Sequence, residues 1–217
     1  MPRHFWRCAA VPALWLAAGC APSGAEKACC LRPSTTMAST NSALSTRSLY
    51  GQPFVWETDT GEQIRLSELR DRPRIVTMFF ASCEGSCVLT LEHLRAIEAS
   101  LPTDIRERVG FVMVTFDPDR DTAKALAAYR SERHLPIDRW TLLRGSSQAT
   151  TNLAASLGTQ FIRNSPRGIV HTTEIAVVDE TGNIVDSQSG THPDLNRTIA
   201  ALHAAMWQKP VARSADR

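Results

Sequence analysis

The sequence predicts an α/β domain built as a three-layer sandwich with an N-terminal hairpin extension. Residues 74–80 (RIVTMFF) and 109–116 (VGFVMVTF) are short, almost continuous apolar runs, which are typical of strands buried on both faces of a parallel sheet. Apolar residues at helical spacing follow them, and strand–turn–strand signals stand near both ends of the domain. This alternation indicates helices packed on one central sheet.

A hairpin and a helix surround the first buried run. Residues 54–57 and 63–66 flank the turn Thr-Asp-Thr-Gly, a pattern typical of two short antiparallel strands. Residues 122–133 and 147–157 are two further helix candidates after the second run. The segment 88–101 is predicted to be helical because apolar residues recur on one face: Leu91, Leu94, Ile97 and Leu101.

A second strand pair and a helix complete the domain. Residues 173–179 and 183–187 flank Glu-Thr-Gly at 180–182, which predicts strand, turn and strand. The folded domain is expected to span residues 49–207, with a polar tail at 208–217. A last helix is expected where four apolar residues keep helical spacing: Leu195, Ile199, Leu202 and Met206.

Charge and composition exclude several classes of protein. The 217 residues hold 24 Lys and Arg against 22 Asp and Glu, and 43% of them are hydrophobic, which is ordinary for a globular chain. Arg3 and Arg7 account for the net charge of +2, so the rest of the chain offers no electrostatic case for binding nucleic acid. Six cysteines are too few for a disulfide scaffold at this size.

Residues 1–20 are expected to form a signal peptide. Two positive charges in residues 1–7 precede an apolar run at 8–18, which is shorter than the roughly 20 residues that a membrane-spanning helix needs. The segment LAAGC at 16–20 resembles a bacterial lipoprotein signal, in which Cys20 is lipidated and becomes the mature N-terminus. A plain secretory signal is the alternative. Either signal places the mature protein outside the cytoplasm, on the periplasmic side.

Cys83 and Cys87 follow the run at 74–80, where the next helix is expected to begin. A spacing of four places both side chains on one face of a helical turn, about 5–6 Å apart at Cβ, and a helix N-terminus stabilises thiolates. Two thiolates so placed can bind one soft metal ion or be oxidised to a disulfide. Two buried structural cysteines are the less favoured alternative.

Three segments resemble the SCO/SenC family: FFASCEGSCVLTLEHL, TFDPDRDT and GIVHTTEIAVVDETGNIV. Its members are membrane-anchored, thioredoxin-like copper proteins that help to build the copper site of cytochrome c oxidase. The resemblance covers roughly residues 49–207. It implies a thioredoxin-like fold, copper as Cu(I) or Cu(II), and a pair of Cys83 and Cys87 that can form a disulfide. The family usually has Pro directly after the second cysteine, where this chain has Val88.

The resemblance also implies a third metal ligand, His171, close to the two cysteines in space. Two thiolates and one imidazole make a trigonal site for Cu(I), and nitrogen also suits Cu(II). Thioredoxins usually have a cis-Pro where this chain has His-Thr-Thr at 171–173, which favours metal binding over general disulfide exchange. Four other histidines lack thiol neighbours in sequence and are expected on the solvent-exposed surface: His93, His134, His192 and His203.

The turn DPDRDT at 117–122 has both a structural and a functional interpretation. As a proline turn, it would place Asp121 or Thr122 as the cap of the next helix. The resemblance implies that Asp117 and Arg120 also shape the site or the surface that meets a partner. Both interpretations remain open at this point.

Residues 21–48 are expected to form a flexible tether between the lipid anchor and the domain. Nine of the 16 residues at 33–48 are Ser or Thr and none is aromatic. A coil of the tether's length would reach roughly 30 Å. The tether carries Cys29 and Cys30, which are either an accessory pair, for weak copper binding or for resolving a mixed disulfide, or incidental.

Two functions from different classes follow. The first is a copper chaperone that passes copper to a partner protein, which the resemblance makes a cytochrome c oxidase subunit. The second is a thiol–disulfide oxidoreductase that reduces the cysteines of a partner. A peroxiredoxin would have Thr three residues before its reactive Cys, where Phe80 and Glu84 stand here. A structural zinc site would need a fourth ligand.

Overall fold

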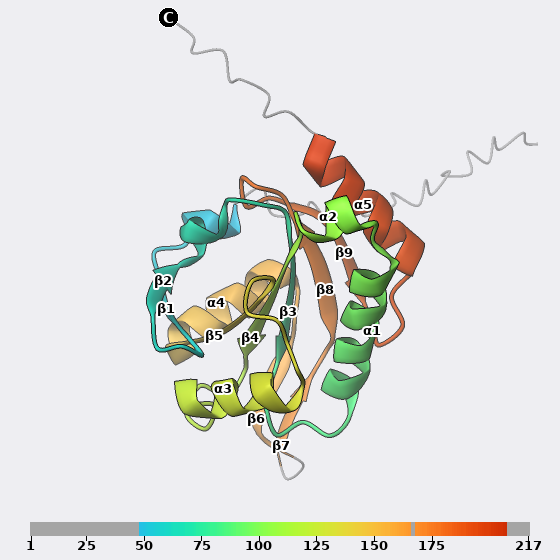
Figure 1. The fold of residues 1–217 in the computed structure, drawn as a ribbon. Helices are drawn as coiled ribbons and strands as arrows, with labels where there is room; N and C mark the ends of the chain where they lie inside the picture. The colour runs from blue at the N-terminus through green and yellow to red at the C-terminus, as the bar shows by residue number, and fades with distance from the viewer. Residues whose placement is uncertain (1–47, 166–167, 208–217) are drawn as a thin grey trace, which may run out of the picture. The chain divides into compact units, whose positions relative to one another are not determined.

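A seven-stranded sheet forms the centre of the domain, with its strands in the order β2-β1-β5-β4-β3-β8-β9 (Figure 1). The computed structural model describes residues 48–165 and 168–207. A separate two-stranded sheet pairs β6 (Phe161–Ser165) with β7 (Gly168–His171). The strands of the main sheet are β1 (Val55–Thr58), β2 (Gln63–Arg65), β3 (Arg74–Phe79), β4 (Gly110–Thr115), β5 (Trp140–Gly145), β8 (Glu174–Val178) and β9 (Ile184–Ser189).

Helices connect these strands. Two short 3-10 turns, η1 (Leu49–Gly51) and η2 (Leu66–Leu69), flank the N-terminal hairpin. The α-helices are α1 (Ser86–Ser100), α2 (Thr103–Arg106), α3 (Ala123–Glu132), α4 (Ser147–Leu157) and α5 (Leu195–Trp207).

Strands β3 and β4 lie parallel at the centre of the sheet, with Arg74 opposite Gly110 and Phe79 opposite Thr115. Strand β5 pairs parallel with β4, and β8 pairs antiparallel with β3. All residues of β3 and β4 are buried, because other elements cover both faces of these two strands. This burial accounts for the continuous apolar runs that predict them.

Two hydrophobic cores, one on each face of the sheet, create the three-layer arrangement. Side chains alternate along β3, so that Ile75 and Phe79 enter one core while Val76 and Met78 enter the other. Helices α1, α3 and α5 close the first core, and α4 closes the second together with the two 3-10 turns (Figure 1). The fold class expected from the sequence is confirmed.

The predicted N-terminal hairpin is present, and it extends the main sheet by pairing with β5. Strands β1 and β2 pair antiparallel, and Trp56 lies opposite Gly145 across the β1–β5 pairing. The indole of Trp56 is fully buried, and a Cβ on Gly145 would lie 2.6 Å from it. The absence of a side chain at position 145 is therefore what allows the hairpin to pack against β5.

Besides the two 3-10 turns, four of the described helices and strands are not predicted by the sequence patterns: α2, β5, β6 and β7. Strand β5 ends in Arg144 and Gly145, so its apolar stretch is only four residues long and is hidden between two helix signals. Strand β6 carries Arg163, Asn164 and Ser165, and helix α2 has a single turn. None of these segments shows a clear hydrophobic period.

The described chain begins with a short segment that docks on the turn between β8 and β9. Ser48 Oγ donates to the Thr181 carbonyl at 2.6 Å, and the Leu49 N–H donates to the Gly182 carbonyl at 2.8 Å. Gly182 has φ +86°, and a Cβ there would meet the Tyr50 ring at 2.6 Å. Glycine is thus required at position 182, where the first described residues form hydrogen bonds with the β8–β9 turn.

Several predicted segments lie outside the described residues. They are the signal peptide at 1–20, the tether at 21–48 except for its last residue, and the tail at 208–217. The same holds for three cysteines of the N-terminal region: Cys20, Cys29 and Cys30. Among the described helices, none is both long enough and apolar enough to cross a membrane.

Candidate metal centre

Cys83 and Cys87 belong to different local structures. After β3, the Cys83 N–H donates to the Phe80 carbonyl at 3.1 Å and closes a turn. Helix α1 begins only at Ser86, and its N-cap, Gly85, has a non-helical backbone (φ −113°, ψ −114°). The expectation that both cysteines share one face of a helical turn is therefore wrong: Cys83 precedes the helix and Cys87 lies in its first turn.

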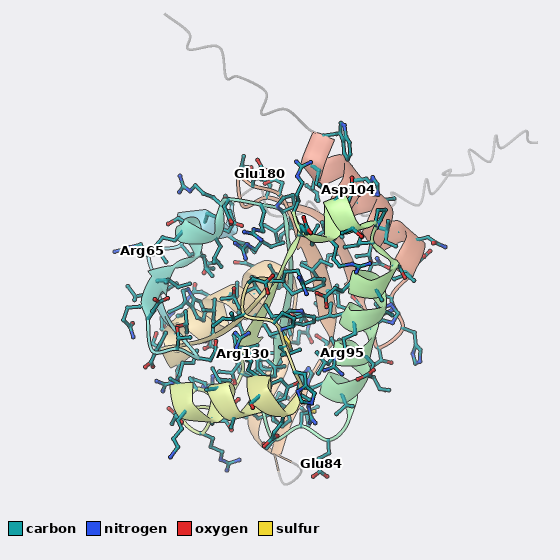
Figure 2. All side chains as sticks on the ribbon, viewed as in Figure 1. Arg65, Glu84, Arg95, Asp104, Arg130 and Glu180 are labelled. Carbon is teal, nitrogen blue, oxygen red and sulfur yellow. The ribbon has the colours of Figure 1, made fainter. Side chains whose placement is uncertain are left out.

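The structure nevertheless brings Cys83, Cys87 and His171 together. One ligand atom of each lies within 4.8 Å of the others, and Cys87 Sγ is 3.6 Å from His171 Nε2. Cys87 is only 3% exposed, whereas Cys83 and His171 are half-buried. Both cysteines are free thiols. Glu84, between them in sequence, is exposed and points away from the domain (Figure 2).

His171 is the last residue of β7, so it approaches the cysteines from a hairpin outside the main sheet. Its ring packs against Phe116, just after β4, with 4.7 Å between centroids, and lies edge-on to Phe80 at 6.0 Å. Arg163 of β6 fastens the hairpin, because its Nε donates to the Phe116 carbonyl at 2.9 Å. The imidazole is therefore held by aromatic packing, and the β6–β7 hairpin that carries it is held by the hydrogen bond from Arg163 of β6.

The hydrogen bond of the second ring nitrogen sets the tautomer of His171. Nδ1 lies 2.9 Å from the Thr172 carbonyl, which can only accept, so Nδ1 carries the hydrogen. In a neutral imidazole of this tautomer, Nε2 carries the lone pair, and this atom lies 3.6 Å from Cys87 Sγ and 3.5 Å from Ser86 Oγ. A neutral imidazole oriented by a backbone carbonyl is a typical metal ligand.

Burial dominates the electrostatics of Cys87. It raises the pKa of the Cys87 thiol well above its usual range, and the neighbouring Cys83 raises that pKa further. The expected stabilisation of a thiolate by the helix N-terminus is therefore outweighed at Cys87. A metal ion bound here would replace the proton of Cys87, because the thiolate is the ligand form.

The 117–122 turn packs behind this loop. Arg120 and Asp117 approach to 3.7 Å, and the Arg120 side chain is 78% exposed. Of the two predicted caps, Thr122 is the N-cap of α3, since its hydroxyl accepts from the Ala125 N–H at 3.2 Å. Neither Asp117 nor Arg120 belongs to the cysteine–histidine group.

Asp121 has a contact that the sequence reasoning missed. Its side chain is buried, and Oδ2 accepts from the Ala81 N–H at 3.0 Å and from the Thr115 hydroxyl. Burial raises the pKa of the Asp121 carboxyl. One feature of the sequence could have indicated this contact: Asp121 lies in the turn that follows the buried strand β4, and β4 neighbours β3, which leads to Cys83.

The other histidines divide into two groups. His134 and His192 are exposed, as predicted. The expectation is wrong for His93 and His203, which are half-buried: His203 stacks on Trp207 with 5.8 Å between centroids, and His93 Nε2 is buried without a hydrogen-bond partner in the described structure. In the described residues, Cys83, Cys87 and His171 form the one group of three that could hold a metal ion.

The fold and this group define a thioredoxin-like protein with two thiols and an imidazole converging at the carboxyl end of a central strand. The chain belongs to the SCO1/SenC family, whose model matches residues 42–207. A relative named SCO1 protein homolog, from Bacillus subtilis (strain 168), is 22% identical over 142 residues, which are 64% of this chain and 73% of the relative.

Solved structures of the family share the fold. Yeast Sco1 with copper bound has a TM-score of 0.63 at 20% identity, covering 79% of this chain and 96% of that one. BsSco, a member of the Sco family of cytochrome c oxidase assembly proteins, has a TM-score of 0.63 at 20% identity and covers 75% and 96%. A disulfide switch has been identified in BsSco. The predicted family and the thioredoxin-like fold are confirmed.

One departure from the family pattern has a structural counterpart. Val88 stands where the family usually has Pro, and its N–H donates to the Gly85 carbonyl at 3.1 Å. Proline has no N–H, so a chain with Pro at position 88 could not form this hydrogen bond. The loop that carries the cysteines is therefore closed by two local backbone bonds, this one and that between Cys83 and Phe80.

Proposed function

We propose that this protein is an extracytoplasmic copper chaperone, which binds one copper ion and delivers it to the copper site of a respiratory oxidase. The copper is cargo: it arrives, is held and is passed on. The proposal places Cys83, Cys87 and His171 as its ligands.

The observation that carries the proposal is the convergence of three soft or borderline donors within 4.8 Å. Two sulfurs and a neutral imidazole nitrogen suit a three-coordinate Cu(I) ion, and the nitrogen also supports Cu(II). A structural zinc site would take four ligands, and the described residues supply three. Copper-bound relatives in the same family support this choice of metal.

The location is proposed from the sequence. A signal peptide at 1–20, lipidation of Cys20 and a tether at 21–48 would hold the domain at the outer face of a membrane. Cys29 and Cys30 on that tether are proposed as accessory thiols. Their replacement by Ser should leave the first copper equivalent unchanged, because the three proposed ligands all lie in the folded domain.

The client is proposed from the family. Sco proteins include cytochrome c oxidase assembly proteins, so an oxidase subunit with an exposed copper site is the expected recipient. Asp117 and Arg120 are proposed to meet that partner. Arg120 is 78% exposed, and its loop packs beside the segment that leads to Cys83.

A second function, thiol–disulfide oxidoreduction, is favoured by the same two free thiols. In that reaction, the Cys83 and Cys87 thiols would lose two electrons and two protons and form one disulfide. A partner's disulfide would take up both electrons and both protons and become two thiols. The half-buried Cys83 would attack, and the buried Cys87 would close the new bond.

The variant His171→Ala separates these two functions. Thiol exchange does not use an imidazole, whereas a three-ligand copper site does. We expect His171→Ala to weaken Cu(II) binding severely and Cu(I) binding less, while reduction of insulin or a model disulfide changes only modestly. Both activities and the metal content are to be measured on one preparation, with and without reductant. Unchanged copper binding with lost disulfide reduction would favour the enzyme instead.

A further inference from the structure

Asp121 is a buried carboxylate between two segments that meet at the metal centre. It is 4% exposed, and its Oδ2 accepts from the Ala81 N–H at 3.0 Å and from the Thr115 hydroxyl. Ala81 lies two residues before Cys83, and Thr115 is the fully buried last residue of β4. One oxygen atom therefore ties the loop of Cys83 to the end of the neighbouring strand.

The direction of these hydrogen bonds makes Asp121 an obligatory acceptor. The Thr115 hydroxyl already accepts from the Asp117 N–H at 2.9 Å, so its own hydrogen is available for Asp121. The Ala81 amide can only donate. Without an acceptor at position 121, the buried Thr115 hydroxyl and the half-buried Ala81 amide would lose their partner, and such a loss usually destabilises more than that of a solvent-exposed hydrogen bond.

The three proposed ligands are fixed in different ways. Cys87 is held by helix α1, and His171 by its hydrogen bond to Thr172 and its packing on Phe116. Cys83 lies in neither a helix nor a strand, in a turn closed by a local backbone bond. That local bond shapes the turn but does not fix where the turn lies relative to the rest of the domain.

We infer that Asp121 is the positioning residue for Cys83, because it anchors the turn at Ala81 and so sets the distance of the Cys83 sulfur from the other two ligands. The inference rests on the proposed function in taking copper as the ion that uses this geometry. The position of the Cys83 thiol can also be tested without copper.

Three variants of the full-length protein test this inference. Asp121→Ala removes the acceptor, Asp121→Asn keeps an acceptor oxygen but removes the charge, and Asp119→Ala removes an equal charge from the exposed part of the same turn. Circular dichroism establishes that each is folded.

The first measurement is the rate at which iodoacetamide alkylates Cys83 in the reduced protein without copper. We expect a several-fold faster rate for Asp121→Ala, because the turn is released. Asp121→Asn should stay within about twofold of the wild type, and Asp119→Ala should match it.

The second measurement is a Cu(I) competition titration. Asp121→Ala should bind about tenfold more weakly, in the range seen when a residue that orients a metal ligand is lost, with rescue by Asn.

Two outcomes would overturn the inference. One is a folded Asp121→Ala with wild-type alkylation and copper affinity; the other is equal effects of Ala and Asn, which would make charge and not the acceptor responsible. If Asp121→Ala does not fold, Thr115→Val decides, because it keeps the shape of the side chain but removes the hydroxyl that holds Asp121. It should speed alkylation of Cys83, and no change would count against the inference. A wild-type protein that binds no copper would refute the proposed function, while the alkylation rates would still decide the role of Asp121.

Discussion

The Nε2 atom of His171 lies 3.6 Å from the Sγ atom of Cys87, although 84 residues separate them in sequence. The cysteine comes from the helix that follows the central strand, and the histidine comes from a two-stranded hairpin that is not part of the main sheet. A metal ion held by both would therefore link two separately anchored parts of the domain. Because the proposed ligands come from different parts of the domain, the contribution of each to copper binding can be tested by replacing one residue at a time.

Replacing either cysteine by alanine should abolish tight Cu(I) binding. At the proposed site, Cys83 and Cys87 each supply one of the two sulfurs, so the loss should exceed the roughly 10–100-fold reduction seen when only a partner of a metal ligand is removed. Competition titration against a Cu(I) chelator measures it. Ser82→Ala, in the exposed part of the same loop, is the control and should bind normally. Wild-type affinity in both cysteine variants would place the site elsewhere.

The two thiols should differ in reactivity when no metal is bound. Cys83 is half-buried, whereas Cys87 is 3% exposed and its pKa is raised by burial. Limited alkylation at neutral pH followed by peptide mass spectrometry should therefore label Cys83 first, by an order of magnitude or more in rate. Unfolding in denaturant should make the two rates similar. Faster labelling of Cys87 in the folded protein would contradict the geometry described here.

The ring of Phe116 should matter for copper beyond its effect on stability. Phe116 and Phe111 are both fully buried, but Phe116 packs on the His171 ring and Phe111 stacks on Trp140 at 4.4 Å. Substitution by leucine should cost about 1–2 kcal/mol of folding free energy at either position. Only Phe116→Leu should weaken Cu(II) binding, because the imidazole loses its support. Equal copper affinity of the two variants, each corrected for its folded fraction, would refute this role.

Alkaline pH should loosen the start of the domain through Tyr50. Burial raises the pKa of Tyr50 from 10.0 to about 12, and its hydroxyl donates to the Leu69 carbonyl at 3.1 Å. Between these two pKa values the unfolded chain releases a proton that the folded protein retains, so stability is complete below the lower value and falls as pH rises toward the upper one. The difference corresponds to about 2–3 kcal/mol at most.

The variant Tyr50→Phe provides the measurement. It should cost about 1 kcal/mol near neutral pH, because the hydrogen bond to Leu69 is lost, and its free energy of unfolding should fall less steeply than that of the wild type above about pH 10. Denaturant unfolding at several pH values gives both quantities. Parallel pH profiles would show that Tyr50 ionises equally easily in both states.

The parts of the fold with long, strong hydrophobic patterns could be predicted from the sequence. Strands β3 and β4 are buried on both faces, so their apolar runs are unbroken, and α1 buries one regular stripe. The β6–β7 hairpin could not be found in this way. Its exposed face carries Ile162 and Val170 while Phe161 packs inward, and Arg163 interrupts the pattern.

The candidate site was predictable in composition but not in detail. The resemblance points to Cys83, Cys87 and His171, and the structure places their ligand atoms together. The sequence predicts a helical turn that includes both cysteines, but α1 begins only at Ser86, after its N-cap Gly85, and so excludes Cys83. For Asp121 the sequence predicts only a helix cap, because it does not reveal which backbone amide faces a carboxylate across two loops.

The chain enters the domain at one end of the sheet, and the thiols lie at the other. Ser48 and Leu49 are fastened to the turn that contains Glu180, whereas Glu84 marks the opposite end (Figure 2). The six residues of β3 between these ends span roughly 20 Å. On the proposed flexible tether, the domain would be attached at the end of the sheet farthest from its thiols, so the attachment would leave the thiol end uncovered for a recipient.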